Sequence, residues 1–235
     1  MAVNFAPFET YKQSIFDDIV GFEDIKDYIT LAFQSPDPQH LWFNGPPACA
    51  KSLLLEKLEE IGGRMIFGSK ITKDGLIKIL YEERPILLLI DEIEKVKDHN
   101  DLSPLLTWLQ DGRVKRDTYK ENDDYIIDSD KWMVFTASNS ITRFKKKMPE
   151  LLSRFSMFQI PEYKKNEFEI IVYNILNHKY NLERPIAENI ALNLTQRNDY
   201  NVREAQRIAG LIKNSDNPYF SINTVFKIKD KYKIQ

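Results

Sequence analysis

One short segment carries a lysine and several small residues at a spacing that suits phosphate binding. In GPPACAKS, Gly45 is followed by four residues, a small residue, and then Lys51 and Ser52. The backbone N–H groups of such a loop, together with the N-terminus of the helix after it, point at an anion. We expect the Lys51 ammonium to contact the outer phosphates of a nucleotide and the Ser52 hydroxyl to ligate Mg²⁺.

The same loop departs from the familiar pattern G-x-x-x-x-G-K-[ST], because Ala50 stands directly before the lysine. Ala48 also stands where such loops often have glycine. If the Ala48 backbone must be left-handed, its Cβ costs about 1–2 kcal/mol. Ala50 is expected to be tolerated provided that its backbone does not need a positive φ. A plain turn before an amphipathic helix is the alternative interpretation. The other loop positions expected to line the nucleotide are Pro46, Pro47 and Cys49.

A second segment, ILLLIDE at 86–92, is an apolar run that ends in two carboxylates. An uninterrupted run of this kind is typical of a strand buried on both faces of a parallel sheet. Asp91 would position Mg²⁺ through its water shell, and Glu92 would polarise an attacking water. An acidic strand end that only favours solubility is the alternative. Because parallel strands bring their carboxyl ends to one edge, we expect this pair to lie near Lys51.

The elements that must hold these residues alternate between strands and helices, which predicts an α/β fold with a largely parallel sheet. A hairpin is also predicted, from two segments joined by the polar turn KEND. The expected strands lie within 40–44, 62–69, 86–92, 113–119, 124–130 and 131–139, and the expected helices at 51–61, 74–84 and 102–112. Only helical patterns follow Pro161, at 166–180, 186–196 and 202–213. We therefore expect an α/β domain over 1–160 and a small helical domain over 161–235.

The composition excludes several classes of protein. The 235 residues carry a net charge of −2, which lacks the global basic character of many nucleic-acid-binding proteins, although a local basic patch is allowed. Cys49 is the only cysteine, so no internal disulfide can form, as suits a reducing compartment. The N-terminus does not resemble a signal peptide, and the longest apolar run is too short to span a membrane. We therefore expect a cytoplasmic protein with no membrane partner.

Six segments, in the same order, resemble those of AAA+ ATPases. Within that superfamily the sequence is similar to the RuvB-type Holliday-junction branch-migration ATPases, and closer to their smaller archaeal RuvB-like relatives. The segments are SIFDDIVGFEDIKDYI, GPPACAKS, ILLLIDE, FTASN, PELLSRF and NVREAQRIA. The resemblance implies a P-loop NTPase with three αβα layers and a parallel sheet, followed by a small α-helical lid. It also implies ATP and Mg²⁺ as cofactors.

The resemblance assigns roles to residues elsewhere in the chain. Ile19 and Val20 would line the adenine pocket. Asn139 would be the polar sensor near the γ-phosphate, and Arg203 would contact that phosphate from the lid. Arg154 would be an arginine finger that acts across a subunit boundary, which implies a homo-oligomer, often a hexameric ring in this family. Each role has a plainer alternative. Asn139 could simply shape a turn, Arg203 could be a solvated charge on its helix, and Arg154 could form a local ion pair.

Two functions stay open at this point. The first is Mg²⁺-dependent ATP hydrolysis coupled to the remodelling of nucleic acid, as in a RuvB-like motor or loader for recombination or replication. The second is a MoxR-like chaperone that remodels protein, since alanine before the lysine also occurs in branches that resemble MoxR-type ATPases. A structural switch that rarely turns over is a third class, against which Glu92 argues.

Two segments are candidate contacts with the remodelled substrate. The hairpin over 113–130 has mixed charges, and a solvated structural hairpin is an equal alternative; its charged residues are Lys115, Arg116, Lys120, Asp123 and Asp124. The loop over 69–75 carries Lys70 and Lys73, which could contact a threaded strand. Arg203 lies 32 residues before Gln235, which is too short for the winged-helix domain of RuvB helicases, so direct duplex binding does not follow from the resemblance.

Overall fold

The structure, a computed structural model, describes residues 14–17, 19–118, 121–126 and 132–232. The chain divides into two compact units. The first unit contains Met1–Pro46 and Ala50–Pro161, and the second contains Pro47–Cys49 and Glu162–Gln235.

A five-stranded parallel sheet forms the centre of the first unit, in the order β2-β3-β6-β1-β7. The strands are β1 (Leu41–Asn44), β2 (Arg64–Phe67), β3 (Leu87–Asp91), β6 (Met133–Ser138) and β7 (Ser156–Gln159). Every residue of β3 and of β6 is buried, as an apolar run between two helical layers requires.

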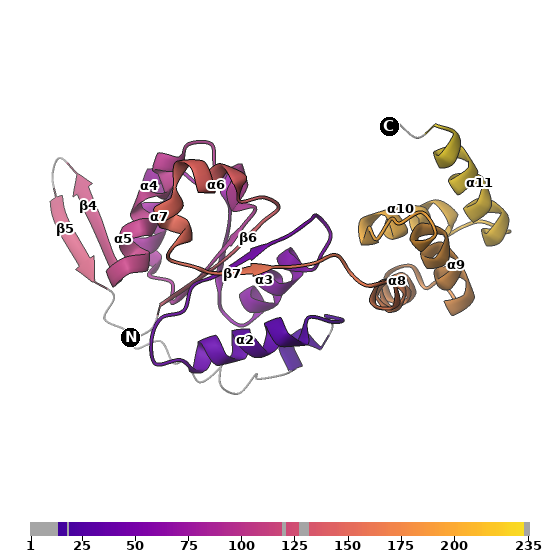
Figure 1. Cartoon of the computed structure of the whole chain (residues 1–235), viewed down its shortest axis with the longest axis horizontal. Coiled ribbons are helices and arrows are strands. Elements are labelled where there is room, and N and C mark those ends of the chain that lie inside the picture. Colours follow the sequence, from indigo (N-terminus) through magenta and orange to yellow (C-terminus); the bar gives the residue numbers. More distant parts are fainter. Residues whose placement is uncertain (1–13, 18, 119–120, 127–131, 233–235) are drawn as a thin grey trace. The chain divides into compact units, whose positions relative to one another are not determined.

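Helices cover both faces of this sheet (Figure 1). On one face lie α2 (Glu23–Gln34) and α3 (Lys51–Glu60). On the other face lie α4 (Lys73–Lys78), α5 (Ser103–Asp111), α6 (Thr142–Lys147) and α7 (Pro149–Leu152). The expected three-layer αβα fold of a P-loop NTPase, with its parallel sheet, is therefore confirmed.

Aromatic packing holds strand β1 against α6 and the turn before β7. The Trp42 ring of β1 is fully buried and meets Phe144 and Phe155 edge-on, with ring centroids 4.9 and 5.2 Å apart respectively. Edge-to-face pairs of this kind stabilise a core by about 0.5–1.5 kcal/mol beyond the area that they bury. This packing holds β1, and hence the start of the following loop, in a fixed place.

Several elements differ from the sequence-based expectation. The predicted helix over 74–84 ends as a π-helical turn, Ile79–Glu83, and left-handed Arg84 (φ 51°) follows it. The hairpin consists of β4 (Arg113–Thr118) and β5 (Glu121–Ile126), with Thr118 paired to Glu121. The prediction of KEND as the turn is therefore wrong, because three of its four residues belong to β5. The connection itself, and the side chains that made the hairpin a candidate contact, lie outside the described residues.

The second unit is helical. It contains α8 (Lys165–Tyr180), α9 (Arg184–Thr195), α10 (Val202–Ile212) and α11 (Pro218–Lys231), the last of which was not predicted. The apolar side of α10 is buried, as its spacing predicts, and Asn201 caps this helix by accepting from the N–H groups of Arg203 and Glu204. Among the described helices, none combines the length and apolar character needed to cross a membrane.

Candidate nucleotide-binding site

The expected site begins at the carboxyl edge of the sheet. In the strand register, Asn44 of β1 is opposite Ser138 of β6, and Ile90 of β3 is opposite Thr136 of the same strand. The Gly45 N–H donates to the Ser138 carbonyl oxygen over 3.2 Å. The phosphate-binding loop, the acidic pair after Ile90 and the residue after Ser138 therefore leave the sheet along one edge.

A chain of side-chain hydrogen bonds fixes the strand ends beneath the loop. The Trp42 indole N–H donates to the Ser138 hydroxyl over 2.8 Å, and this hydroxyl donates to Asn44 Oδ1 over 3.0 Å. Asn44 Nδ2 in turn donates to Gln159 Oε1 over 2.8 Å. These bonds join β6, β1 and β7 at the level where the loop begins.

The loop contains two alanines with left-handed backbones. The φ angle is 66° at Ala48 and 52° at Ala50, and Ala50 is the N-cap residue of α3. Ala50 was expected to be tolerated only if its backbone did not need a positive φ, and this condition is not met. Left-handed residues help to direct successive N–H groups toward one point, and each alanine Cβ in that conformation costs about 1–2 kcal/mol. Ala48 and Ala50 therefore both adopt the left-handed backbone that favours glycine.

Lys51 brings a buried positive charge to this loop. Its side chain belongs to the first residue of α3, and the whole residue is only 6% exposed. Lys51 Nζ donates to the Gly45 carbonyl over 2.8 Å and to the Pro46 carbonyl over 2.5 Å. Ser52 follows it half-buried, and Cys49 is a buried cysteine within the loop.

The acidic pair has a constrained backbone. Asp91 is 8% exposed, and its Oδ1 accepts from the Glu92 N–H over 2.8 Å. Glu92 is left-handed (φ 52°, ψ 43°), so the chain turns sharply at the end of β3. The Glu92 carboxylate accepts from Lys95 Nζ over 2.5 Å, and this bond raises the pKa of Lys95.

Asn139 is exposed and held by Glu94, a residue that the sequence analysis did not single out. Glu94 Oε1 accepts two bonds from Asn139, one from the backbone N–H over 3.1 Å and one from Nδ2 over 2.8 Å. The other oxygen, Oε2, is buried and has no hydrogen-bond partner among the described residues. The only sequence signal for this contact is the third carboxylate in DEIE, which has no meaning until the strands are paired.

The two arginines with expected roles belong to different units. Arg154 is exposed just before β7, donates from Nη2 to Gln110 Oε1 over 3.1 Å, and forms no ion pair within the described part of the chain. Arg203 is exposed on α10 of the second unit. Its neighbour Arg207 pairs with Glu204 at 3.0 Å.

The residues expected to line an adenine pocket lie in the first unit. Ile19 is 2% exposed, and its carbonyl accepts from Lys26 Nζ over 2.6 Å. Val20 beside it is half-buried, and Gly21 follows with a φ of 79°. The backbone before α2 is therefore anchored by Lys26.

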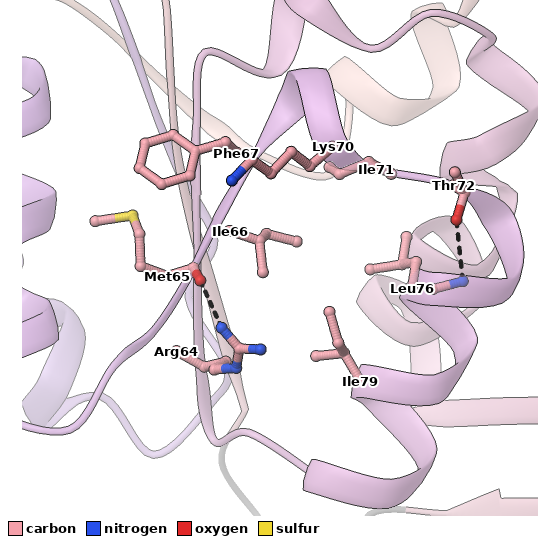
Figure 2. Close-up of a pocket in the computed structure, with 10 residues that line it drawn as sticks. Arg64, Met65, Ile66, Phe67, Lys70, Ile71, Thr72, Leu76 and Ile79 are labelled. Carbon is pink, nitrogen blue, oxygen red and sulfur yellow. Dashed lines mark hydrogen bonds between the residues drawn. The ribbon is translucent and has the colours of Figure 1, made fainter.

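A separate hollow of about 330 Å³ lies between β2 and α4 (Figure 2). Apolar side chains line most of it, among them Ile66, Leu76 and Ile79. At its rim Phe67 is 44% exposed, and Lys70 Nζ lies 6.0 Å from the Phe67 ring centroid. This hollow adjoins the loop that was expected to contact a threaded substrate, and none of the loop residues 45–52 lines it.

The residues at the sheet edge fit a nucleoside triphosphate. The left-handed loop, the N-terminus of the ten-residue α3 and the buried Lys51 ammonium are the groups that a phosphate chain needs. No cluster of three or more His, Cys, Asp and Glu suited to a metal occurs in the described ranges. Mg²⁺ takes few protein ligands and is held by a carboxylate, waters and phosphates. Ser52 and Asp91 are the residues that would hold it.

Comparisons with known proteins identify the fold. No protein-family model matches the sequence, and no curated protein does. Solved structures of RuvB mutants from Thermotoga maritima do match. One gives a TM-score of 0.67 at 16% identity and covers 92% of this chain and 72% of that one. Another gives a TM-score of 0.63 at 20% identity and covers 94% of this chain and 72% of that one. The chain thus has the fold of the RuvB-like AAA+ ATPases.

Proposed function

We propose that this protein is an oligomeric AAA+ ATPase of the RuvB-like kind, which couples Mg²⁺-dependent ATP hydrolysis to the remodelling of nucleic acid. One observation carries the ATPase assignment. The loop at 45–52, the acidic pair Asp91–Glu92 and Asn139 leave neighbouring parallel strands at the same sheet edge. Chance resemblance of one segment to a phosphate-binding loop would not place the other two beside it.

The residues divide the work as follows. Lys51 and the loop N–H groups bind the phosphates, while Ser52 and Asp91 hold the metal ion. Bound Mg²⁺ would supply charge neutralisation on the phosphate oxygens. Glu92 accepts a hydrogen bond from the attacking water and orients it, once its carboxylate is released from Lys95. Asn139 completes the polar lining. Ile19 and Val20 contact the base, and Arg203 contacts the γ-phosphate.

Arg154 supports the oligomeric part of the proposal. An exposed guanidinium without an ion pair in the described residues is suited to meet phosphate on a neighbouring subunit. An arginine supplied in this way contributes roughly 10³–10⁵ in rate. A homo-oligomeric ring, such as a hexamer, would give each subunit a site and a finger for its neighbour.

A protein substrate is the second candidate, and the hollow beside Phe67 favours it. An exposed aromatic ring over an apolar hollow suits a polypeptide better than a phosphate backbone. Lys70 and Lys73, both exposed in the same segment, suit nucleic acid instead. Hydrolysis that rises with added DNA, falls steeply with salt and is lost on replacing both lysines by alanine supports nucleic acid. Stimulation by a polypeptide that is lost in Phe67→Ala supports the alternative.

Calorimetric titration of ATP with Mg²⁺ into the protein tests nucleotide binding. We expect binding heat for the wild type and for Lys57→Ala, a control on the same helix, but weak or no heat for Lys51→Ala. The absence of heat from the wild type, with identical behaviour of Lys51→Ala, would overturn the assignment.

A further inference from the structure

The contact between Glu94 and Asn139 has an unusual form. Both Asn139 donors, the backbone N–H and the side-chain Nδ2, converge on one carboxylate oxygen at 3.1 and 2.8 Å. The second oxygen of Glu94 is buried without a hydrogen-bond partner in the described part of the chain. An unsatisfied buried oxygen is costly and uncommon in folded proteins, so this one calls for an explanation.

The chemistry of a carboxylate fixes which way the Asn139 amide faces. An ionised carboxylate can only accept hydrogen bonds, so the amide group at 2.8 Å must be the NH₂ end and not the carbonyl. Asn139 Oδ1 therefore lies on the other side of the Cβ–Cγ bond from the Nδ2 that contacts Glu94. One N–H of Nδ2 and the oxygen Oδ1 stay available to other partners.

From this geometry we infer that Glu94 is a positioning residue for Asn139. It selects one of the two amide orientations, and so decides where the sensor presents its donor and its acceptor. The inference rests on the proposed ATPase function and deepens it. With the amide held, Oδ1 can accept from a water and the remaining N–H can donate to a phosphate oxygen. A flipped amide would exchange donor and acceptor and repel both.

The location of Glu94 supports this role. It lies two residues after Glu92, in the turn Ile93–Lys95 that follows β3, while Asn139 follows β6. Strands β3 and β6 are neighbours in the sheet. A single carboxylate therefore links the turn that carries the water-orienting residue to the sensor, over a sequence separation of 45 residues.

The first test needs no nucleotide. In a protein labelled with ¹⁵N, the Asn139 side-chain amide is assigned as the resonance lost in Asn139→Ala. We expect Glu94→Ala to shift that resonance and to speed hydrogen exchange of the Asn139 backbone N–H by at least about tenfold. Glu59→Ala, which removes an exposed carboxylate from the end of α3, should change neither. An unshifted resonance and unchanged exchange in Glu94→Ala would overturn the inference.

The second test separates positioning from stability and from the proposed function. Glu94→Ala should lower kcat by roughly 10- to 100-fold, as expected for a residue that orients a functional group, with ATP affinity changed less than about twofold. Glu94→Gln, which can turn either a donor or an acceptor to Asn139, should lower kcat less. The double variant with Asn139→Ala should be no slower than Asn139→Ala alone. Additive losses would contradict the inference. A wild type that does not hydrolyse ATP would instead refute the ATPase proposal, while the spectroscopic test still decides the contact.

Discussion

Gly68 and Glu92 approach so closely that a Cβ atom on Gly68 would lie 2.1 Å from the Glu92 carbonyl oxygen. The turn Gly68–Lys70 after β2 packs against the turn Ile93–Lys95 after β3, so the contact joins two backbones, neither of which can give way cheaply. The loop expected to touch the substrate is therefore mechanically linked to the carboxylate expected to orient the attacking water.

Gly68→Ala should consequently lower the free energy of unfolding by about 1–3 kcal/mol, the usual cost of overpacking. It should also slow hydrolysis, because the Glu92 turn must move. Thermal or urea unfolding measures the first effect. Gly210→Ala on α10 is the control, since its nearest atom would be 3.8 Å away, and replacing a helical glycine there should stabilise by roughly 0.5–1 kcal/mol. Equal stability changes in the two variants would contradict the packing argument.

The strained alanines of the phosphate loop predict that glycine is the better residue at both positions. Ala50→Gly removes a left-handed Cβ that costs about 1–2 kcal/mol. Glycine loses more backbone entropy on folding, which offsets about 0.5–1 kcal/mol of that gain. We expect a net gain of about 0.5–1 kcal/mol in urea unfolding for Ala50→Gly, and likewise for Ala48→Gly. The same substitution at Ala187, inside α9, should instead destabilise. A loss at position 50 as large as that at 187 would show that the loop does not need φ above zero.

Glu92→Gln should bind ATP and fail to hydrolyse it, because a neutral amide cannot draw a proton from the attacking water. The Lys95 pair that it breaks is half-exposed, so the stability change should be small. Binding by calorimetry and turnover by phosphate release separate the two effects. Lys95→Met, which breaks the same pair and keeps the carboxylate, should still hydrolyse ATP. An unimpaired rate in Glu92→Gln would refute the role of this residue.

The trans action of Arg154 predicts that two inactive variants rescue each other. Arg154→Ala should keep ATP affinity and lose roughly 10³-fold in turnover. Mixing it with Glu92→Gln forms some interfaces in which an intact Glu92 faces an intact Arg154 from the neighbour. We expect hydrolysis to reappear in the mixture, and light scattering with a non-hydrolysable ATP analogue to report oligomers for both variants. No recovery from subunits that do co-assemble would place the arginine in cis or outside the site.

The sequence predicted the elements that carry strong local signals. The apolar run that ends at Asp91 forms β3, as predicted. A strand buried on both faces is apolar throughout, with no alternation of polar and apolar residues, so the run is a strong signal. By contrast, β7 was not predicted, because its short SMFQ segment is only half-buried and becomes a strand through pairing with β1. Helix α11 was obscured by the lysines around its buried Ile222 and Phe226. The strain at Ala50 and the contact of Glu94 with Asn139 depend on backbone angles and strand pairing, which local patterns do not specify.

A buried histidine couples stability to pH at the other end of β1. His40 is 8% exposed, and its Nδ1 accepts from the Val134 N–H over 3.2 Å. Nε2 must then carry the proton, and it donates to the Leu109 carbonyl over 3.2 Å. Burial lowers the pKa of His40 to about 4, and the bond to Leu109 opposes this only in part.

The resulting prediction is a loss of stability in mild acid. Between pH 6.5, the usual histidine pKa, and about 4, the unfolded chain binds a proton that the folded protein does not, so the free energy of unfolding rises with pH. Above pH 6.5 the titration of His40 no longer changes the free energy of unfolding, which falls by about 3 kcal/mol as the pH drops to 4. In urea unfolding across this range, His40→Gln should be less stable than the wild type at pH 7 and should lose less stability on acidification. His178→Gln, at an exposed histidine of α8, should keep the wild-type slope. If the wild type and His40→Gln showed the same slope, folding would leave the pKa of His40 unchanged, and the predicted coupling would be wrong.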